Sequence, residues 1–346
     1  MSSVSVVIPC YKYGHFLEEA VSSVLDDQEG VDVRVLIIDD ASPDDSADAA
    51  AKIAARDPRV EVLVHPTNKG NIATYNEGLL EWAQGDYTAL VSADDRLTPG
   101  ALRRARDLLD AHPEVGFVYG TALWFWQDQP VPPPRTRLRG WSVWPGEWWL
   151  ERRLRQGENN ITAPEVVVRT SLQKQVGGYD PRLPHSADQE MWARLAAHAH
   201  VGFLRGVDQA FYRVHGQSMR GTFNALMDLR QKRLAFETTL DRYGDRLRDP
   251  QRLRDGINRR ISHQALAVAT RSLDLGTAEH DVVDQLVEFA LECWPKAELF
   301  PIYHTLRARR HVDPRILTAL QPSRPVEFGR RARGWLQRRS WKYRGY

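Results

Sequence analysis

The sequence of 346 residues contains very little cysteine and no long apolar segment. Its only two cysteines, Cys10 and Cys293, are far apart and belong to no Cys-x-x-Cys or Cys/His spacing, which argues against a disulfide framework and against structural zinc. The longest apolar runs, such as residues 33–38 and 87–91, fall well short of the roughly 20 residues that span a bilayer. Residues 1–3 carry no basic patch and lead into no apolar signal core. We therefore expect a cytoplasmic protein without a transmembrane helix.

Two common nucleotide-binding signatures are also absent. The turn after the first predicted strand, residues 9–14, lacks Gly-x-Gly-x-x-Gly, and Gly-x-x-x-x-Gly-Lys-[Ser/Thr] occurs nowhere in the chain. This excludes the usual dinucleotide-binding and P-loop sites. A phosphate-bearing ligand would need another source of positive charge.

The charge is unevenly distributed, although the formal net charge is only +2. The first 100 residues contain 18 acidic and 7 basic side chains, and the remainder contains 27 acidic and 40 basic ones. An acidic surface repels nucleic acid and attracts divalent cations, whereas a basic one attracts phosphates or anionic lipid. No RNA- or DNA-binding motif accompanies the basic charge, so we expect no nucleic-acid partner.

Strand and helix patterns alternate over the first 120 residues. β-branched runs bounded by turn residues predict strands at 5–9, 33–38, 60–64, 87–91 and 115–119. Apolar residues at three-to-four spacing predict helices at 15–25, 45–55, 72–82 and 100–111, with Ser42 and Thr98 at N-cap positions and Pro99 opening the last helix. The alternation predicts an α/β, Rossmann-like fold with a mostly parallel sheet and helices on both faces.

The pattern changes twice further along the chain. Residues 121–160 hold six of the eleven tryptophans and a proline cluster, which predicts a loop-rich insertion in a sheet domain covering residues 1–220. Residues 221–322 read as a helical domain. The tail at 323–346 is basic and aromatic, which is typical either of a peripheral membrane contact or of a solvated segment.

Polar residues follow the first four predicted strands directly. They lie at residues 9–11, 39–40, 65–68 and 92–95, and the carboxyl ends of parallel strands meet at one edge of a sheet. Asp94 and Asp95 offer the hard oxygen ligands that Mg²⁺ and Mn²⁺ prefer. The alternative is that this pair only caps the following helix, and from these two residues alone both interpretations stay open.

Seven segments in order resemble the family 2 inverting glycosyltransferases, which have the GT-A fold. The segments, covering about residues 4–218, are VSVVIPCY (4–11), IIDDASPDDS (37–46), NKGNIATYNEG (68–78), SADDRLTP (92–99), GGYD (177–180), DQEMWARLA (188–196) and YRVHGQS (212–218).

The resemblance implies a nucleotide-sugar donor, most often a UDP-sugar, and Mn²⁺ or Mg²⁺ as cofactor. It assigns seven residues to the donor: Pro9 and Tyr11 at the base and ribose, Asp40 at the base, Asn68 and Gly70 in the loop beside it, and Asp94 and Asp95 at the ribose and metal. Asp95 is the direct metal ligand in this scheme. His215, in the YRVH segment, is expected near the diphosphate or metal.

Asp188 occupies the position of the family's catalytic base. Inversion needs a carboxylate that takes the proton of the acceptor hydroxyl as its oxygen attacks the anomeric carbon. Taken without the resemblance, the residues favour a helix N-cap at Asp188, and the family pattern reverses this interpretation. The sequence departs from the family at Ser92, where an Asp is common, and at Ala187, where a Glu is usual.

The sequence thus predicts a metal-dependent inverting glycosyltransferase that adds a single sugar to a saccharide or glycoconjugate hydroxyl. The Gln-x-x-Arg-Trp segment of processive synthases is absent. The resemblance suggests bacterial surface-polysaccharide or glycoconjugate assembly, at the inner face of the plasma membrane if the tail binds lipid. Two alternatives stay open: a nucleotidyl- or sugar-phosphate transferase, and a non-catalytic GT-A-like scaffold, which the departures at Ser92 and Ala187 motivate.

Overall fold

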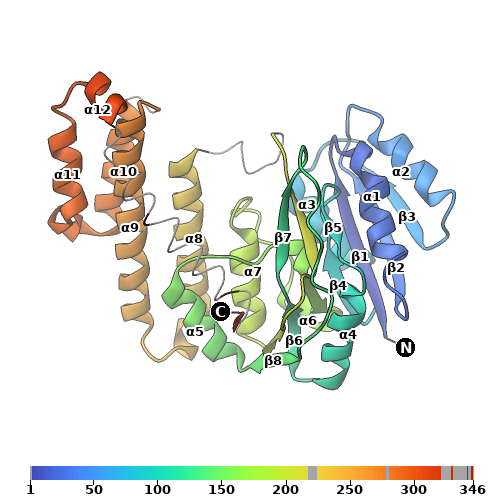
Figure 1. Cartoon of the computed structure of the whole chain (residues 1–346). Helices are drawn as coiled ribbons and strands as arrows, with labels where there is room; N and C mark the ends of the chain where they lie inside the picture. Colours follow the sequence, from blue (N-terminus) through green and yellow to red (C-terminus); the bar gives the residue numbers. More distant parts are fainter. Residues whose placement is uncertain are drawn as a thin grey trace. The chain divides into compact units, whose positions relative to one another are not determined.

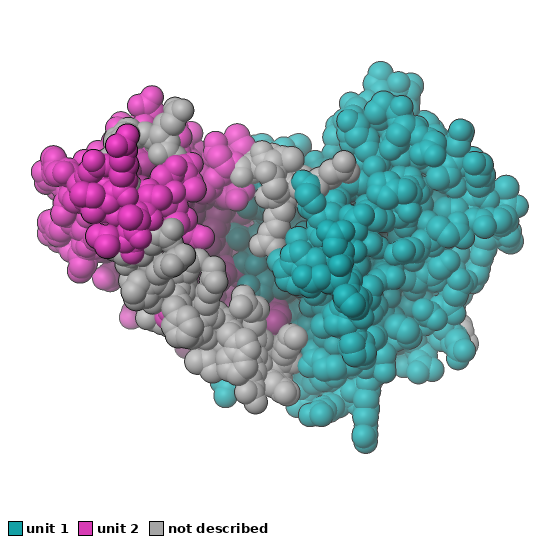
Figure 2. All heavy atoms as spheres, turned by 45° about the horizontal axis from the view of Figure 1, so that its top comes forward, with its two compact units in different colours: residues 1–150, 159–221, 342–345 teal, residues 151–158, 222–341, 346 magenta. Residues whose placement is uncertain are grey.

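The computed structural model describes residues 2–216, 224–277 and 280–320 and the single positions 329, 341, 344 and 345. The chain forms two compact units (Figure 2). The sheet unit comprises residues 1–150, 159–221 and 342–345, and the helical unit comprises residues 151–158, 222–341 and 346. Within the described ranges, no helix has both the length and the apolar character needed to cross a membrane.

An eight-stranded sheet with strand order β3-β2-β1-β4-β9-β6-β10-β8 forms the centre of the sheet unit (Figure 1). The first four strands in this order pair in parallel, and β9 and β8 are antiparallel to their neighbours. The strands are β1 (Ser3–Cys10), β2 (Asp32–Asp39), β3 (Val60–Val64), β4 (Tyr87–Leu90), β6 (Val115–Tyr119), β8 (Trp141–Trp144), β9 (Val166–Arg169) and β10 (His200–Leu204).

A second sheet of three strands has the order β5-β11-β7, with β5 (Arg96–Leu97), β11 (Ala210–Val214) and β7 (Ala122–Trp126). The helices that begin in the sheet unit are α1 (Gly14–Leu25), α2 (Ser46–Ala54), α3 (Asn71–Asn76), α4 (Ala101–Ala111), α5 (Gly146–Gln156), α6 (Thr170–Val176) and α7 (Ala187–Ala196). A π-helical turn η1 (Glu77–Trp82) continues α3, and a 3₁₀ turn η2 (Ala163–Glu165) precedes β9.

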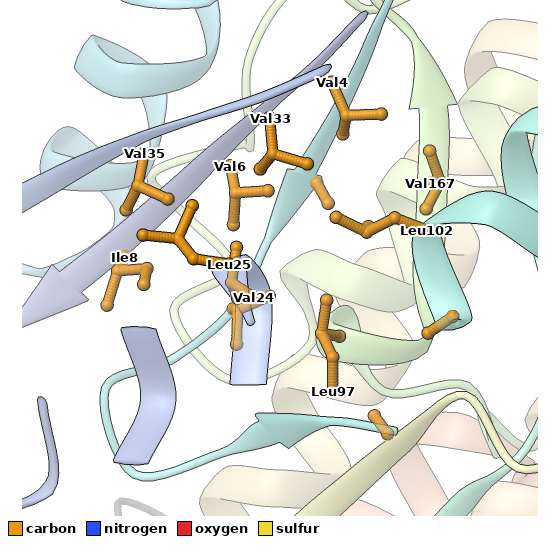
Figure 3. Close-up of a cluster of buried hydrophobic side chains, with 14 of the residues drawn as sticks. Val4, Val6, Ile8, Val24, Leu25, Val33, Val35, Leu97, Leu102 and Val167 are labelled. Atoms are coloured by element: carbon orange, nitrogen blue, oxygen red, sulfur yellow. The ribbon is translucent and has the colours of Figure 1, made fainter. Parts of the chain in front are cut away.

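The main core lies where β1 and β2 meet α1 and α4 (Figure 3). β1 is buried on both faces, which explains its nearly continuous apolar sequence. Val7 faces η1, and the alternate residues of β1 join the cluster with side chains from β2, α1 and α4. This cluster includes Val4, Val6, Ile8, Leu17, Val24, Val33, Val35, Leu102 and Leu108.

Two predicted helix caps are wrong. The second helix begins after Asp45 rather than Ser42, whose hydroxyl accepts a hydrogen bond from the Lys12 N–H (3.0 Å). The helix predicted to open at Pro99 begins at Ala101, with Gly100 as N-cap in the left-handed conformation. Thr98 instead donates its hydroxyl hydrogen to the Asp208 carbonyl (2.6 Å), because this bond satisfies a buried backbone acceptor.

The tryptophan-rich segment is more regular than the loop-rich insertion that its composition predicts. It contributes β7, β8 and α5, and an ion pair fixes the loop between β7 and β8. Arg135 donates to the buried carboxylate of Asp208 (2.6 Å) and to Thr121 (2.9 Å).

The helical unit is built around its longest helix, α9 (Pro250–Leu275), which contacts four other helices. These are α8 (Ala225–Tyr243), α10 (His280–Cys293), α11 (Pro301–Arg309) and α12 (Pro314–Leu320). 3₁₀ turns η4 (Gly244–Arg246) and η5 (Pro295–Leu299) link some of them. Asp249 caps α9 by accepting from the Arg252 N–H (3.0 Å), and Gly276 ends it in the left-handed conformation.

Most of the predicted basic tail lies outside the described residues. Trp341, one of its aromatic side chains, is buried, and the Arg153 guanidinium stacks 4.8 Å from its ring centroid. The Gly345 carbonyl accepts a hydrogen bond from the Tyr119 hydroxyl. Trp341 is therefore not exposed to a lipid surface, and the membrane interpretation falls on residues that are not described.

Gly78 provides a test of the close packing behind β1. A Cβ at this position would overlap both methyl groups of Val7, a stiff side chain on a buried strand. Gly78→Ala should lower the free energy of unfolding by about 1–3 kcal/mol, measured by urea denaturation. Gly256, inside α9, has no atom within 4 Å of such a Cβ. Gly256→Ala should therefore be neutral or stabilising by about 0.5–1 kcal/mol, and equal destabilisation by both changes would contradict the packing argument.

Candidate functional site

The carboxyl ends of β1, β2, β3 and β4 lie side by side, and backbone hydrogen bonds join the segments that follow them. The Asp40 N–H donates to the Cys10 carbonyl (2.9 Å) and the His65 N–H donates to the Asp39 carbonyl (2.9 Å). The Ala93 N–H donates to the Pro9 carbonyl (3.3 Å). The structure thus brings together all four segments that the sequence places in one crevice.

Asp40 is held by three hydrogen-bond donors. Its Oδ1 accepts from the His65 ring nitrogen Nδ1 (2.7 Å) and the Lys69 N–H (2.8 Å), and its Oδ2 accepts from the Gly70 N–H (2.9 Å). Burial alone would raise the pKa of Asp40, but these donors hold it below its ordinary value. Gly70 has a φ of +84°, which favours glycine where the backbone turns its N–H toward the carboxylate. Asn68 also contributes, because its side-chain amide donates to the Asp40 carbonyl (3.0 Å).

The second nitrogen of His65 meets another carboxylate. Nε2 lies 3.1 Å from Glu77 Oε2, which also accepts from the Lys69 ammonium (2.8 Å). The His65 ring is almost fully buried between the two acidic groups. Sequence reasoning did not single out His65 or Glu77. The only available signal was the position of His65 after the third strand, because the pairing with Glu77 depends on the fold.

Pro9 and Tyr11 lie at the end of β1, where the backbone is strained. Tyr11 is exposed, and the Lys12 ammonium lies 5.1 Å from its ring centroid. Lys12 (φ 63°) and Ala41 (φ 56°) both adopt the left-handed conformation, which costs energy for residues other than glycine. Among the described residues, these two loops beside the expected base site hold the non-glycine residues with positive φ.

Asp94 and Asp95 face different partners. His215 Nε2 lies 3.0 Å from Asp94 Oδ2, whereas Asp95 Oδ1 accepts from the Arg213 N–H (2.9 Å). Asp95 is only 2% exposed, and its burial and then the neighbouring charge of Asp94 raise its pKa well above the ordinary value. The pair therefore concentrates negative charge that is costly to bury without a cation.

Arg213 holds this pair in place, a role that sequence reasoning missed although the residue lies in the YRVH segment. Its Nε donates to the Asp94 carbonyl (2.8 Å) and its Nη2 to Glu19 on α1 (2.6 Å). The buried guanidinium stacks on Phe16 and Phe125, 4.4 and 4.8 Å from the ring centroids. Stacking and hydrogen bonds together hold the Arg213 guanidinium against the loop that contains Asp94 and Asp95, the aspartate loop.

The side chains of Asp94, Asp95 and His215 offer ligand atoms that suit a divalent cation. Carboxylate oxygens and an imidazole nitrogen are ligands that Mn²⁺ accepts, and Asp94 and His215 are already in contact. Within the described ranges, no three His, Cys, Asp or Glu side chains are arranged to hold a metal ion by themselves. The residues present therefore fit part of the ligand set of a divalent cation.

Asp188 lies in the first turn of α7 and is half-buried. Ser186, not Asp188, is the N-cap, so the capping interpretation of Asp188 is wrong. Burial raises the pKa of Asp188 to about 7. Glu190, also in the first turn, is fully buried and paired with Arg194 (2.6 Å), which leaves Asp188 as the carboxylate of this turn that is available to take a proton.

Tyr75 links Asp188 electrostatically to the aspartate pair. Burial raises the pKa of the Tyr75 phenol, and the charges of Asp188, Asp94 and Asp95 raise it further. The phenol therefore lies within electrostatic range of all three carboxylates. Its ring meets the buried ring of Tyr179 edge-on, with centroids 5.7 Å apart.

Asn76 anchors the segment that leads to Asp188. Its side-chain amide donates to the Tyr179 carbonyl (2.9 Å) and accepts from the Tyr179 N–H (2.6 Å). A Cβ on Gly178 would overlap this amide, so the Gly-Gly-Tyr-Asp turn needs glycine at that position. The contact ties α3, which carries Tyr75, to the turn that precedes α7.

Comparison with known families identifies the N-terminal part of the chain. Residues 5–172 match the model described as "Glycosyl transferase family 2". This segment belongs to glycosyltransferase family 2. Sequence relatives of the chain include an uncharacterized protein of Mycobacterium tuberculosis, 30% identical over 214 residues that cover 58% of this chain and 64% of the relative. Glycosyltransferase GlyG of Streptococcus pneumoniae is 35% identical over 92 residues, covering 27% of this chain and 30% of GlyG. The matches thus span less than two thirds of these relatives.

Solved structures extend the likeness of the fold beyond the family 2 segment. S. aureus TarS 1–349, in complex with UDP-GlcNAc, has a TM-score of 0.63 at 17% identity, covering 94% of this chain and 92% of that chain. The mannosyltransferase PcManGT from Pyrobaculum calidifontis, in complex with GDP-Man and Mn²⁺, has a TM-score of 0.51 at 15% identity, covering 92% and 86%. The predicted fold class is confirmed: a GT-A-like, mostly parallel sheet with helices, followed by a helical region.

The hydrogen bonds to Asp40 predict an acid-sensitive contribution to the stability of the family 2 segment. The pKa of Asp40 is lower in the folded state than in the unfolded chain, so its contribution is complete above about pH 4 and is lost as the pH falls through the folded-state pKa. Asp40→Asn should lower the free energy of unfolding at pH 7 by about 1–3 kcal/mol.

Urea denaturation between pH 2.5 and 7 checks this prediction. The difference between the two proteins should shrink below about pH 4. Asp32→Asn, at an exposed position of β2, is the control and should change stability by less than about 0.5 kcal/mol. A wild-type advantage that persists unchanged to the lowest pH would contradict the assignment.

Proposed function

We propose that the chain is a metal-dependent inverting glycosyltransferase. It transfers a single sugar from a UDP-sugar to a hydroxyl group of a saccharide or glycoconjugate, in bacterial surface-polysaccharide or glycoconjugate assembly in the cytoplasm. The observation that carries the proposal is the environment of Asp188. Its half-buried carboxylate, with a pKa of about 7, shares Tyr75 as an electrostatic neighbour with the Asp94-Asp95 pair.

The proposed reaction is one displacement. Asp188 takes the proton of the acceptor hydroxyl while the acceptor oxygen forms a bond to the anomeric carbon. The bond between that carbon and the diphosphate oxygen breaks, and UDP leaves with the electron pair. A single base is sufficient because the configuration inverts in one step.

Asp94, Asp95 and His215 would hold the divalent cation. When bound, this ion acts as a Lewis acid and stabilises charge on the leaving diphosphate. Arg213 fixes both aspartates, so the chain presents its metal-binding oxygens without reorganisation. The complex of PcManGT with GDP-Man and Mn²⁺ supports a divalent cation, and the TarS complex with UDP-GlcNAc supports a nucleotide-sugar donor.

The hydrogen bonding of Asp40 supports uridine as the base. A carboxylate offers about four acceptor positions, and three are used by His65, Lys69 and Gly70. About one position remains for a ligand. Uracil presents a single N–H on its pairing edge, whereas guanine presents two neighbouring donors there. The site therefore suits uracil better than guanine.

The pH dependence of transfer tests the role of Asp188. Because the raised pKa leaves Asp188 protonated in acid, kcat/KM should fall about tenfold per pH unit below pH 7. Asp188→Asn should abolish transfer and leave UDP affinity within about twofold, measured by calorimetry, since the side chain contacts the acceptor rather than the nucleotide. Near-normal turnover of this variant would refute the assignment.

Nucleotide binding tests the metal site. A thermal-shift panel of UDP, dTDP, GDP and CMP, with and without Mn²⁺, should show a shift of several degrees for UDP that requires Mn²⁺. Asp95→Asn keeps an acceptor for the Arg213 N–H but removes the charge, so it should lose the Mn²⁺-dependent part of the shift. Asp48→Asn, at an exposed position of α2, should retain it. A UDP shift independent of Mn²⁺ in all three proteins would contradict the proposed metal site.

The reaction products distinguish the proposed activity from other uses of the same fold. Incubation with a panel of UDP-sugars should release UDP and no pyrophosphate. Pyrophosphate release would favour a nucleotidyl- or sugar-phosphate transferase. Nucleotide binding without turnover of any donor would favour a non-catalytic scaffold.

A further inference from the structure

The three-stranded sheet β5-β11-β7 has one face turned toward the aspartate loop and another that exposes aromatic rings. β7 is an edge strand and runs parallel to β11, with Trp124 opposite Tyr212 and Trp126 opposite Val214. Because side chains alternate along a strand, these four residues share one face. Trp124 is 41% exposed and Trp126 is 50% exposed. The Tyr212 and Trp124 rings lie 5.0 Å apart, with their planes 31° from each other.

The opposite face of the same two strands serves the donor site. Phe125 and Arg213, directly opposite each other in the register, are both buried. The Arg213 N–H donates to Asp95, and its side chain donates to the Asp94 carbonyl. Tyr212 is therefore one residue from the backbone group that fixes Asp95. The exposed rings begin beside the expected reaction centre, on the strand that organises it.

We propose that Trp124, Trp126 and Tyr212 form an aromatic platform that binds the saccharide acceptor by stacking on its sugar rings. The proposal rests on the proposed glycosyltransferase function, because it places the acceptor next to the donor site. The platform deepens that function by assigning the acceptor class: a pyranose-containing chain rather than a lipid or a bare polypeptide.

The chemistry of the surface favours a sugar. The faces of a pyranose ring carry C–H groups that pack on the negative faces of aromatic rings, while its edges carry hydroxyl groups that need polar partners. Beyond Trp126, β7 runs into a turn closed by the Gln129 N–H on the Trp126 carbonyl (2.9 Å). This turn exposes Gln127, Asp128 and Gln129. Ring faces with a polar border match both parts of a sugar.

The cost of exposing the two indoles also favours a binding role. A tryptophan side chain buries 150–250 Å² when packed, so leaving two of them open to water forgoes stabilisation. Trp149, from the same tryptophan-rich segment, is 1% exposed and shows that this part of the chain can bury an indole. Trp124 and Trp126 are two residues apart on one strand, about 7 Å along its axis, so both rings can contact one saccharide chain.

Binding to a saccharide array tests the platform. The labelled full-length protein is applied to immobilised di- to tetrasaccharides of glucose, galactose, rhamnose and N-acetylglucosamine, in the presence of UDP and Mn²⁺. The wild-type protein should be retained on at least one saccharide. Trp124→Leu with Trp126→Leu, which keeps apolar side chains but removes the rings, should weaken retention by about tenfold or more. Trp124→Phe with Trp126→Phe should restore most of it.

Trp148→Leu is the matched control, because Trp148 is 42% exposed but lies on α5. It should bind saccharides as the wild-type protein does. UDP affinity and the slow hydrolysis of UDP-sugars without acceptor should stay within about twofold in every variant, since the platform does not contact the nucleotide.

Three results would overturn the platform. In the first, the wild-type protein hydrolyses UDP-sugars but is retained on no saccharide; in the second, the wild-type and leucine variants are retained equally. In the third, the protein binds phosphatidylglycerol vesicles through the tryptophans and does not bind saccharides. Each leaves the glycosyltransferase proposal standing. Conversely, ring-dependent saccharide binding without any turnover of UDP-sugars would support the platform and refute the proposed transfer reaction.

Discussion

The repulsion between closely spaced carboxylates is the constraint around which the sheet unit is organised. Asp94 and Asp95 are neighbours in sequence, and Asp95 is almost completely buried. Such an arrangement is unfavourable unless positive charge and hydrogen-bond donors compensate for it. The chain supplies these through Arg213 on β11 and His215 directly after it. The small sheet that carries β11 therefore offsets part of the negative charge of Asp94 and Asp95. The negative charge that remains on the pair favours cation binding.

The same principle governs the other end of the crevice. Asp40 and Glu77 both contact the buried ring of His65, and backbone N–H groups complete the hydrogen bonding of Asp40. A carboxylate with this many partners is rigid as well as charged. The Asp40 end of the site is thus held rigidly by hydrogen bonds within the protein, whereas the Asp94-Asp95 end keeps an excess of negative charge.

Much of this arrangement could be predicted from the sequence because it depends on local patterns. The strand predicted at residues 60–64 and the one at 115–119 are observed with the same bounds. The meeting of the polar segments at one edge of the sheet follows from the parallel order of the strands alone. The role of His65 could not be predicted, because Glu77 reaches it only through the packing of η1 against the sheet.

The wrong predictions have a common cause. Thr98 was expected to cap a helix because its hydroxyl is close to backbone N–H groups in sequence, but the buried Asp208 carbonyl offers it a better partner. The composition of the tryptophan-rich segment predicts loops because the alternation in β7 is hidden: all five of its residues are apolar aromatic or aliphatic side chains, and two of its rings are exposed rather than buried. In both cases a tertiary contact or a surface role overrode the local signal.

β11 places functional side chains on both faces of the small sheet. Its hydrogen bonds to β5 and β7 set the register, so successive side chains point in opposite directions: Arg213 inward to the aspartates, Tyr212 and Val214 outward. Inserting or deleting one residue in this strand would exchange the two sides, turning the guanidinium into solvent and an aromatic ring toward the carboxylates. The length of this strand is therefore a fixed dimension of the sheet unit.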